Sequence, residues 1–182
     1  EINGPPALTA TVWKNGVPMS LDAGTDGSFA MGLYVNGTDV YASGNKFTGV
    51  STYLPAIWKN GTVSYPSAIK GVVQAIFVYN NDIYATGYEL IGSQRIGKLW
   101  KNGVATTLGN GTNTSFGNGV YVYNGDVYVA YTESVNGTNV AKYSKNGMAT
   151  ALTDGTRSAG AGSIQVLGND IYVTGVESNG TR

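Results

Sequence analysis

The 182-residue sequence contains no cysteine and no histidine. Without cysteine the chain cannot form disulfides, bind metals through thiolates or use thiol chemistry. Without histidine it lacks the side chain that most often serves as general base and metal ligand. Nucleophilic Ser/His/Asp and Cys/His arrangements are therefore impossible. We expect no cofactor and no metal, and the chain is predicted not to be an enzyme.

Charges and long apolar runs are also scarce. Only 12% of the residues are charged and the formal net charge is zero, so no basic face is expected to neutralise phosphates and nucleic-acid binding is excluded. No run of about 18 apolar residues occurs, so no membrane span is expected. Because the chain begins with Glu1 rather than Met, we expect a processed product, extracellular or on the cell surface, or part of a longer chain.

Repetition is what the sequence does have. The tetrapeptide Trp-Lys-Asn-Gly occurs three times, and Tyr143-Ser144-Lys145-Asn146-Gly147 is interpreted as a fourth copy with one residue inserted before the lysine. The tripeptide Asp-(Val/Ile)-Tyr recurs every 44 residues or so, a period typical of propeller blades. The repeated signature consists of Trp13, Trp58, Trp100 and Tyr143, of Asp39, Asp82, Asp126 and Asp170, and of Tyr41, Tyr84, Tyr128 and Tyr172.

Each repeat reads as four short strands joined by tight turns, and each Asn-Gly pair predicts a type I′ hairpin. In order, the chain contains the last two strands of a unit, three whole units and the first two strands of another. This predicts an all-β, four-bladed β-propeller with one blade split between the termini, whose closure would remove exposed edges. The predicted single domain, 1–182, divides into blade 4 outer strands 1–24, blades 25–66, 67–110 and 111–154, and blade 4 inner strands 155–182.

These motifs resemble bacterial secreted β-propeller repeat proteins, which are related in architecture to kelch and WD-type propellers. The resemblance covers essentially the whole chain. It implies that the first strand of each blade lines a central channel and that the fourth lies at the outer edge. It implies no activity. The Gly-His and Trp-Asp pairs of WD repeats are absent, which argues against a scaffold of that particular type.

The signature residues have structural and functional interpretations. The tryptophan and tyrosine columns are expected to fill the wedges between blades, although they could form a ring of sugar-stacking aromatics. The repeated aspartates are expected to accept hydrogen bonds from backbone N–H groups of turns, although they could ring an axial cation. Three glutamates recur at equivalent places, which argues against a catalytic pair because such a pair needs two different environments: Glu89, Glu133 and Glu177.

Two functions remain open at this point. The first is a non-catalytic structural or interaction protein that self-assembles into rings or filaments through the split blade, with the chain itself or another surface protein as partner. The alternative is a carbohydrate-binding, lectin-like propeller whose partner is a glycan. Specificity is expected in the most divergent loops, Lys46–Pro55 and Glu89–Gly97.

Overall fold

The computed structural model describes residues 8–22, 24, 26–49 and 51–180, so residues 1–7 of the first predicted segment lie outside it. These residues form sixteen strands in five antiparallel sheets, and none of them lies in a helix. The described part of the chain accordingly offers no helix that could cross a membrane. The all-β prediction is confirmed.

Three of the sheets are complete, with four strands each in chain order. The first contains β3 (Ser28–Asn36), β4 (Asp39–Phe47), β5 (Tyr53–Lys59) and β6 (Thr62–Ser64). The second contains β7 (Gly71–Tyr79), β8 (Asp82–Ile91), β9 (Gln94–Lys101) and β10 (Val104–Thr107). The third contains β11 (Ser115–Tyr123), β12 (Asp126–Val135), β13 (Thr138–Lys145) and β14 (Met148–Ala151).

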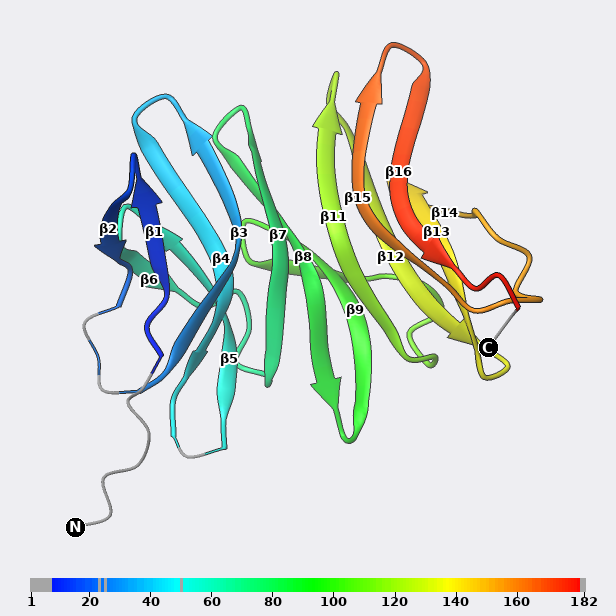
Figure 1. Cartoon of the computed structure of the whole chain (residues 1–182), viewed down its shortest axis with the longest axis horizontal. Coiled ribbons are helices and arrows are strands. Elements are labelled where there is room, and N and C mark those ends of the chain that lie inside the picture. Colours follow the sequence, from blue (N-terminus) through cyan, green and yellow to red (C-terminus); the bar gives the residue numbers. More distant parts are fainter. Residues whose placement is uncertain (1–7, 23, 25, 50, 181–182) are drawn as a thin grey trace.

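The two remaining sheets have only two strands each and lie at opposite ends of the molecule (Figure 1). The N-terminal pair is β1 (Thr11–Lys14) and β2 (Val17–Ser20), and the C-terminal pair is β15 (Ala159–Leu167) and β16 (Asp170–Glu177). Among the described residues these pairs are not hydrogen-bonded to each other. The split blade is therefore open within one chain, and the closed four-bladed propeller stays a prediction.

Asparagine and glycine set the hairpins, because a type I′ turn needs positive φ at both central residues. Asn60 has φ 50° and Gly61 has φ 82°, and the other Asn-Gly turns of the tryptophan motif repeat these values closely. The strands β3, β7, β11 and β15 each carry a register shift, for example between Val73 and Ala75 in β7. Such β-bulges bend a strand and increase its twist.

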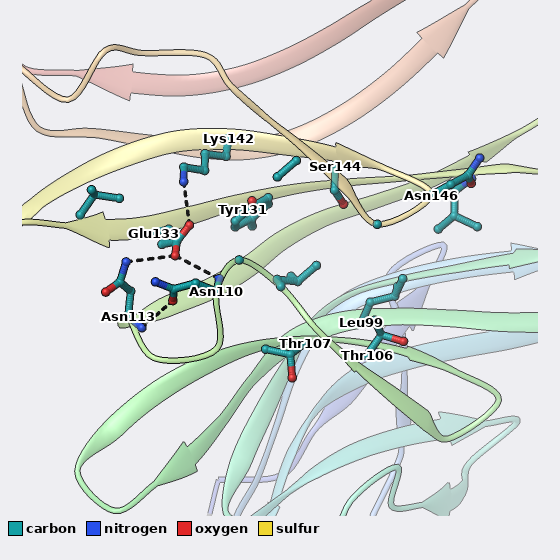
Figure 2. A pocket seen from close by; sticks show the side chains of 16 residues that line it. Leu99, Thr106, Thr107, Asn110, Asn113, Tyr131, Glu133, Lys142, Ser144 and Asn146 are labelled. Atoms are coloured by element: carbon teal, nitrogen blue, oxygen red, sulfur yellow. Dashed lines mark hydrogen bonds and ion pairs between the residues drawn. The ribbon is translucent and has the colours of Figure 1, made fainter.

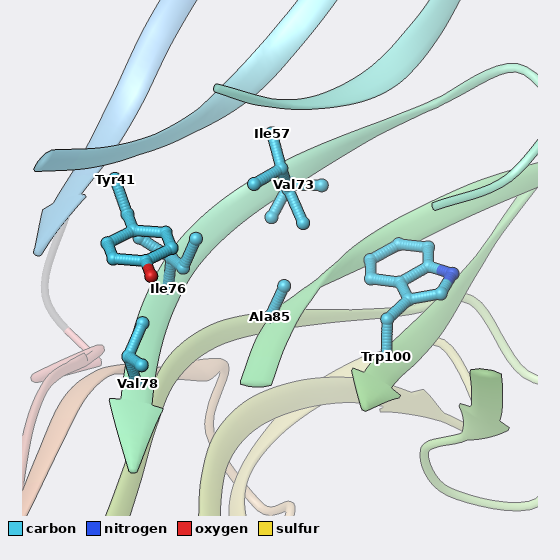
Figure 3. Close-up of a cluster of buried hydrophobic side chains, with 7 residues drawn as sticks. All are labelled: Tyr41, Ile57, Val73, Ile76, Val78, Ala85 and Trp100. Carbon is cyan, nitrogen blue, oxygen red and sulfur yellow. The ribbon is translucent and has the colours of Figure 1, made fainter. Parts of the chain in front are cut away.

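Successive sheets pack face to face, with their first strands β3, β7, β11 and β15 next to one another (Figure 1). The core is consequently divided into clusters between sheets. In one of them Tyr41 and Ile57 of the first complete sheet meet Val73, Ile76 and Trp100 of the second (Figure 3). This wedge is filled by apolar side chains from both sheets, and Trp100 has the packing role expected of its column.

Candidate functional site

An Asp–Lys–Asn clamp joins the second and third strands of every complete sheet. In the first, Lys59 Nζ lies 2.8 Å from Asp39 Oδ2, and Asn60 Nδ2 donates to Asp39 Oδ1 at 2.8 Å. The amide oxygen of Asn60 accepts the backbone N–H of Val40 at 2.9 Å. The ammonium of Lys59 also lies 5.2 Å from the centroid of the Tyr41 ring, a cation–π distance.

The same contacts recur in the other two complete sheets, where Asp82 and Asp126 bind Lys101 and Lys145 at 2.8 and 2.7 Å. The hydrogen bond from the lysine, followed by that from the asparagine, lowers the pKa of each aspartate below its usual value. The described residues contain no cluster of acidic side chains suited to a metal ion. Each aspartate thus binds lysine and asparagine side chains of the adjacent strand and turn. The backbone N–H that the aspartates were expected to bind is bound instead by the asparagine side chain.

The fourth clamp is divided between the two ends of the molecule. Lys14 ends the open strand β1 and Asn15 follows it, whereas Asp170 begins the open strand β16. Neither Lys14 nor Asp170 forms an ion pair within the part of the chain that the structure describes. Asp170 accepts a long hydrogen bond, 3.5 Å, from the Tyr172 hydroxyl two residues away.

The aromatic columns differ between the middle and the ends in the same way. Trp58 and Trp100 are completely buried, but Trp13 is 66% exposed. Tyr41 and Tyr84 are 4% exposed and Tyr128 5%, but Tyr172 is 57% exposed. The repeated sequence therefore produces a buried aromatic only where the sheet is complete and covered.

Each end also has an apolar hollow beside its open strand. At the N-terminal end a pocket of about 450 Å³ lies between Trp13 and Met19 on one side and Leu33 and Val35 on the other. At the C-terminal end a pocket of about 370 Å³ is lined by Ala141, Leu152, Val173 and Gly175, among others.

The strand register corrects one position of the signature. Lys145 pairs with Tyr128 as Lys59 pairs with Tyr41, so no residue is inserted in the fourth copy. Ser144 consequently stands where Trp58 stands in the first complete sheet, and Tyr143 lies one residue away. The sequence itself shows this substitution when the repeats are aligned on their lysines. Alignment on the aromatic residues hides it.

A pocket of about 610 Å³ lies at this serine (Figure 2). Ser144 and Tyr131 of the third complete sheet face Leu99 and Thr106 of the second across it (Figure 2). Near one end, Glu133 binds Lys142 at 2.7 Å and accepts a hydrogen bond from Asn113 at 3.2 Å.

Two ionisable groups of this pocket have shifted pKa values. Burial raises the pKa of Glu133, but the hydrogen bond from Lys142 and the backbone N–H of Asn110 outweigh it, so the pKa lies below its usual value. Burial, with a smaller contribution from Glu133, raises the pKa of Tyr131 to about 12. At neutral pH the carboxylate is therefore ionised and paired, and the phenol stays protonated.

No protein-family model matches the chain, and no curated protein matches it in sequence. The resemblance to secreted propeller repeats stays a prediction.

Proposed function

We propose that this protein is a non-catalytic, extracellular or cell-surface interaction protein that assembles with copies of itself. In this proposal β16 of one copy pairs with β1 of the next, giving a four-stranded sheet in the order β15, β16, β1, β2. Repetition of that step gives rings or filaments, depending on whether the symmetry closes. Closure of the same sheet within one chain, the four-bladed propeller, is the competing outcome.

The observation that carries the proposal is the exposure of the repeated aromatics at both ends. Trp58 and Trp100 are fully buried, but the equivalent Trp13 is two-thirds exposed and leaves a large apolar surface in water. Exposed apolar patches of this kind mark interaction sites. The two ends expose complementary halves of one motif rather than unrelated surfaces. Each end therefore supplies what the other lacks.

The repeats define the register of the joined sheet. Tyr41 pairs with Lys59 and Ala42 with Trp58 in the first complete sheet, and Tyr84 and Ala85 pair likewise in the second. By the same offset Tyr172 falls opposite Lys14, and Val173 opposite Trp13. Lys14 then reaches Asp170, and Asn15 caps the backbone N–H of Ile171.

The glycine in the second strand supports this pairing. Gly44 and Gly87 follow Tyr41 and Tyr84 by three residues, and a Cβ at either would overlap a carbonyl oxygen of the adjacent first strand. The sheets with these glycines carry tryptophan on the third strand, whereas the sheet with Tyr131 carries serine. β16 has Gly175 at this position, so it is suited to pair with a strand that carries tryptophan. β1 is such a strand, because it carries Trp13.

The neighbouring sheets have sites for the side chains of the joined sheet. Trp58 lies in a buried cluster with Ala10 and Leu21, and Leu21 N–H donates to the Ala10 carbonyl at 2.8 Å. Leu152 N–H donates to the Ala141 carbonyl at the same distance, so these two residues repeat the arrangement. They line the C-terminal pocket, which therefore has the composition to receive Trp13 of a second copy.

The surface of β3 fits the same assembly. Ile76 and Val78 of β7 are buried in the cluster that contains Tyr41 of the preceding sheet. Their counterparts in β3, Leu33 and Val35, are both 56% exposed. In the joined sheet Tyr172 of the second copy occupies the position of Tyr41, so it would cover them.

Light scattering on the 182-residue chain tests the proposal, with Trp13→Ala as the key variant. We expect the wild type to form concentration-dependent oligomers and Trp13→Ala to remain monomeric with an almost unchanged melting temperature, because Trp13 is mostly exposed in one chain. A monomeric wild type whose Trp13 is protected from a soluble fluorescence quencher would instead indicate closure within one chain. A monomeric wild type with Trp13 fully quenched would overturn the proposal.

Charge reversal separates assembly between chains from closure within a chain. Lys14→Asp and Asp170→Lys each place like charges at the junction and should each weaken assembly. An equimolar mixture restores both oppositely charged junctions, but only between different chains. We therefore expect the mixture to assemble in alternating order, and failure of the mixture would contradict pairing between copies.

A further inference from the structure

We propose that the pocket beside Ser144 binds a small planar aromatic molecule, of indole size, in the space that tryptophan fills between the preceding sheets. This binding site is separate from the open strands and does not depend on self-assembly. It arises from one departure from the repeat, the serine on β13.

Strand pairing places Ser144 at the tryptophan position. Trp58 pairs with Ala42 and Trp100 with Ala85, and Ser144 pairs with Val129, the residue that likewise follows the repeated tyrosine. Two sheets thus direct an indole toward the sheet before them, and the third directs a hydroxymethyl group.

The wall opposite Ser144 is the surface on which an indole packs elsewhere in this chain. Trp58 is clustered with Leu21, and Val12 packs against that cluster. In the sheet that precedes the one carrying Ser144, the residues equivalent to Val12 and Leu21 are Leu99 and Leu108. Both line the pocket. The cavity therefore has the same kind of wall as the one that accommodates Trp58.

Tyr131 fills part of the vacated space. It replaces the glycine found at Gly44 and Gly87, it is completely buried, and it joins the apolar cluster that includes Leu108 and Val129. Even with this ring in place, about 610 Å³ remains beside Ser144. A volume of that size is ample for one small ligand.

One polar atom of the pocket has no partner. The Tyr131 hydroxyl is buried and forms no hydrogen bond with any described residue. Buried polar groups are normally satisfied, and an unsatisfied one calls for an explanation. A ligand that carries a hydrogen-bonding group on its ring would supply the missing bond, because the phenol can donate or accept.

The rest of the pocket selects against sugars. Val127, Ala149 and the two leucines contribute apolar surface. Polar residues also line the pocket, but Glu133 is already bound to Lys142 and Asn113. The side chain of Asn110 accepts backbone N–H groups of its own loop. A saccharide has several hydroxyls, and burial without partners would be unfavourable for each. The apolar part of the lining is instead suited to an aromatic ring, since apolar protein cavities bind aromatic molecules. The ligand class is thus aromatic with a single polar group.

Calorimetric titration with indole tests this site, with Ser144→Trp as the variant that fills it. We expect one site per wild-type chain and at least about a tenfold loss of affinity in Ser144→Trp, because the new side chain occupies the ligand's space. Trp100→Ser is the matched control, since it opens the equivalent wedge and should give a second site. Indole binding to Trp100→Ser but not to the wild type, or unchanged binding to Ser144→Trp, would overturn the proposal.

A second variant keeps the test independent of how well Ser144→Trp folds. Tyr131→Phe removes a hydroxyl that bonds to nothing in the described structure, so the fold should be retained. It should weaken indole about 5- to 10-fold, as for the loss of one hydrogen bond, and leave the affinity for indene, which lacks the N–H, unchanged. Equal effects on both compounds would refute the assigned role of the hydroxyl, and displacement of indole by methyl glucoside would refute the aromatic class.

Discussion

Trp58 and Trp13 occupy equivalent positions in two sheets of one chain, yet one is completely buried and the other is mostly exposed. Their local sequences, Trp-Lys-Asn-Gly, are identical. Trp58 packs against Ala10 and Leu21, which flank the strands of the sheet that precedes its own, whereas no sheet precedes that of Trp13 among the described residues. Local sequence therefore determines the hairpin, and the neighbouring sheet determines whether its side chains are buried.

The comparison extends to the polar residues of the repeat. Glu133 and Glu89 lie at equivalent positions in the second strands β12 and β8, and both are buried. Lys142 lies 2.7 Å from Glu133, whereas Lys98 lies 3.6 Å from Glu89. Because the sequence repeats, equivalent residues occupy sites that differ in one feature, such as burial for the tryptophans or ion-pair distance for the glutamates. One member of each pair therefore serves as the control for the other.

The tryptophan pair gives the largest expected difference. Trp58→Ala should lower the free energy of unfolding by about 3–5 kcal/mol, because it leaves a void between two sheets. Trp13→Ala should change the stability of the isolated chain by less than about 1 kcal/mol, as expected for an exposed position. Urea denaturation at a concentration where the chain is monomeric measures both. Equal losses would show that Trp13 is covered within a single chain.

The ion pair of Glu133 gives the next largest difference. Lys142→Met leaves a buried carboxylate without its cation and should lower the free energy of unfolding by about 2–3 kcal/mol at pH 7. Lys98→Met should have a smaller effect, because its ion pair is longer. The double variant Glu133→Gln/Lys142→Met removes both charges and should recover much of the loss. Denaturation at pH 7 ranks the three variants, and equal losses in the two single variants would contradict the ranking.

The pH dependence of that loss has a definite sign. The pKa of Glu133 in the folded wild type lies below its ordinary value of 4.5, so the ionised group stabilises the fold above about pH 4.5. This contribution is lost as the pH falls through the lowered pKa. The gap between wild type and Lys142→Met should therefore be widest at neutral pH and should narrow below pH 4. A gap independent of pH would mean that packing, not charge, accounts for the loss.

Much of the strand layout follows from the sequence because the period, the Asn-Gly turns and the alternation of apolar residues all indicate the same hairpins. Asn60 and Gly61 adopt the predicted turn conformation for a local reason, positive φ. The closure of the split blade depends instead on contacts between residues at the two ends of the chain. No local pattern determines whether those ends meet within a chain or between chains.

The sequence alone does not reveal the pocket at Ser144, for a different reason. Aromatic residues dominate the comparison of repeats and align Tyr143 with the tryptophans, whereas the pairing of Lys145 with Tyr128 places Ser144 at the tryptophan position. The compensating change lies on the neighbouring strand, where Tyr131 replaces glycine. Only the pairing of Val129 with Ser144 brings these two departures together, which is why the site emerges from the sheet and not from either motif.

The clamp aspartates give the smallest expected difference. Asp82→Asn removes the ion pair with Lys101 and should lower the melting temperature slightly, less than either variant above, because exposed ion pairs contribute little. The pKa of Asp82 is lowered from 3.8 by Lys101 and Asn102, so the contribution of the ion pair to stability is present above about pH 4 and is lost as the pH falls through the lowered pKa. It also shrinks in high salt.

Asp170→Asn should leave the monomer's melting temperature unchanged and weaken assembly, since Asp170 has no lysine partner in the described chain. Calorimetric melting at low protein concentration, with and without 1 M salt (a Debye length of about 3 Å), measures both variants. If Asp170→Asn lowered the monomer's melting temperature as Asp82→Asn does, the fourth clamp would form within one chain, and the closed four-bladed propeller would replace the assembly.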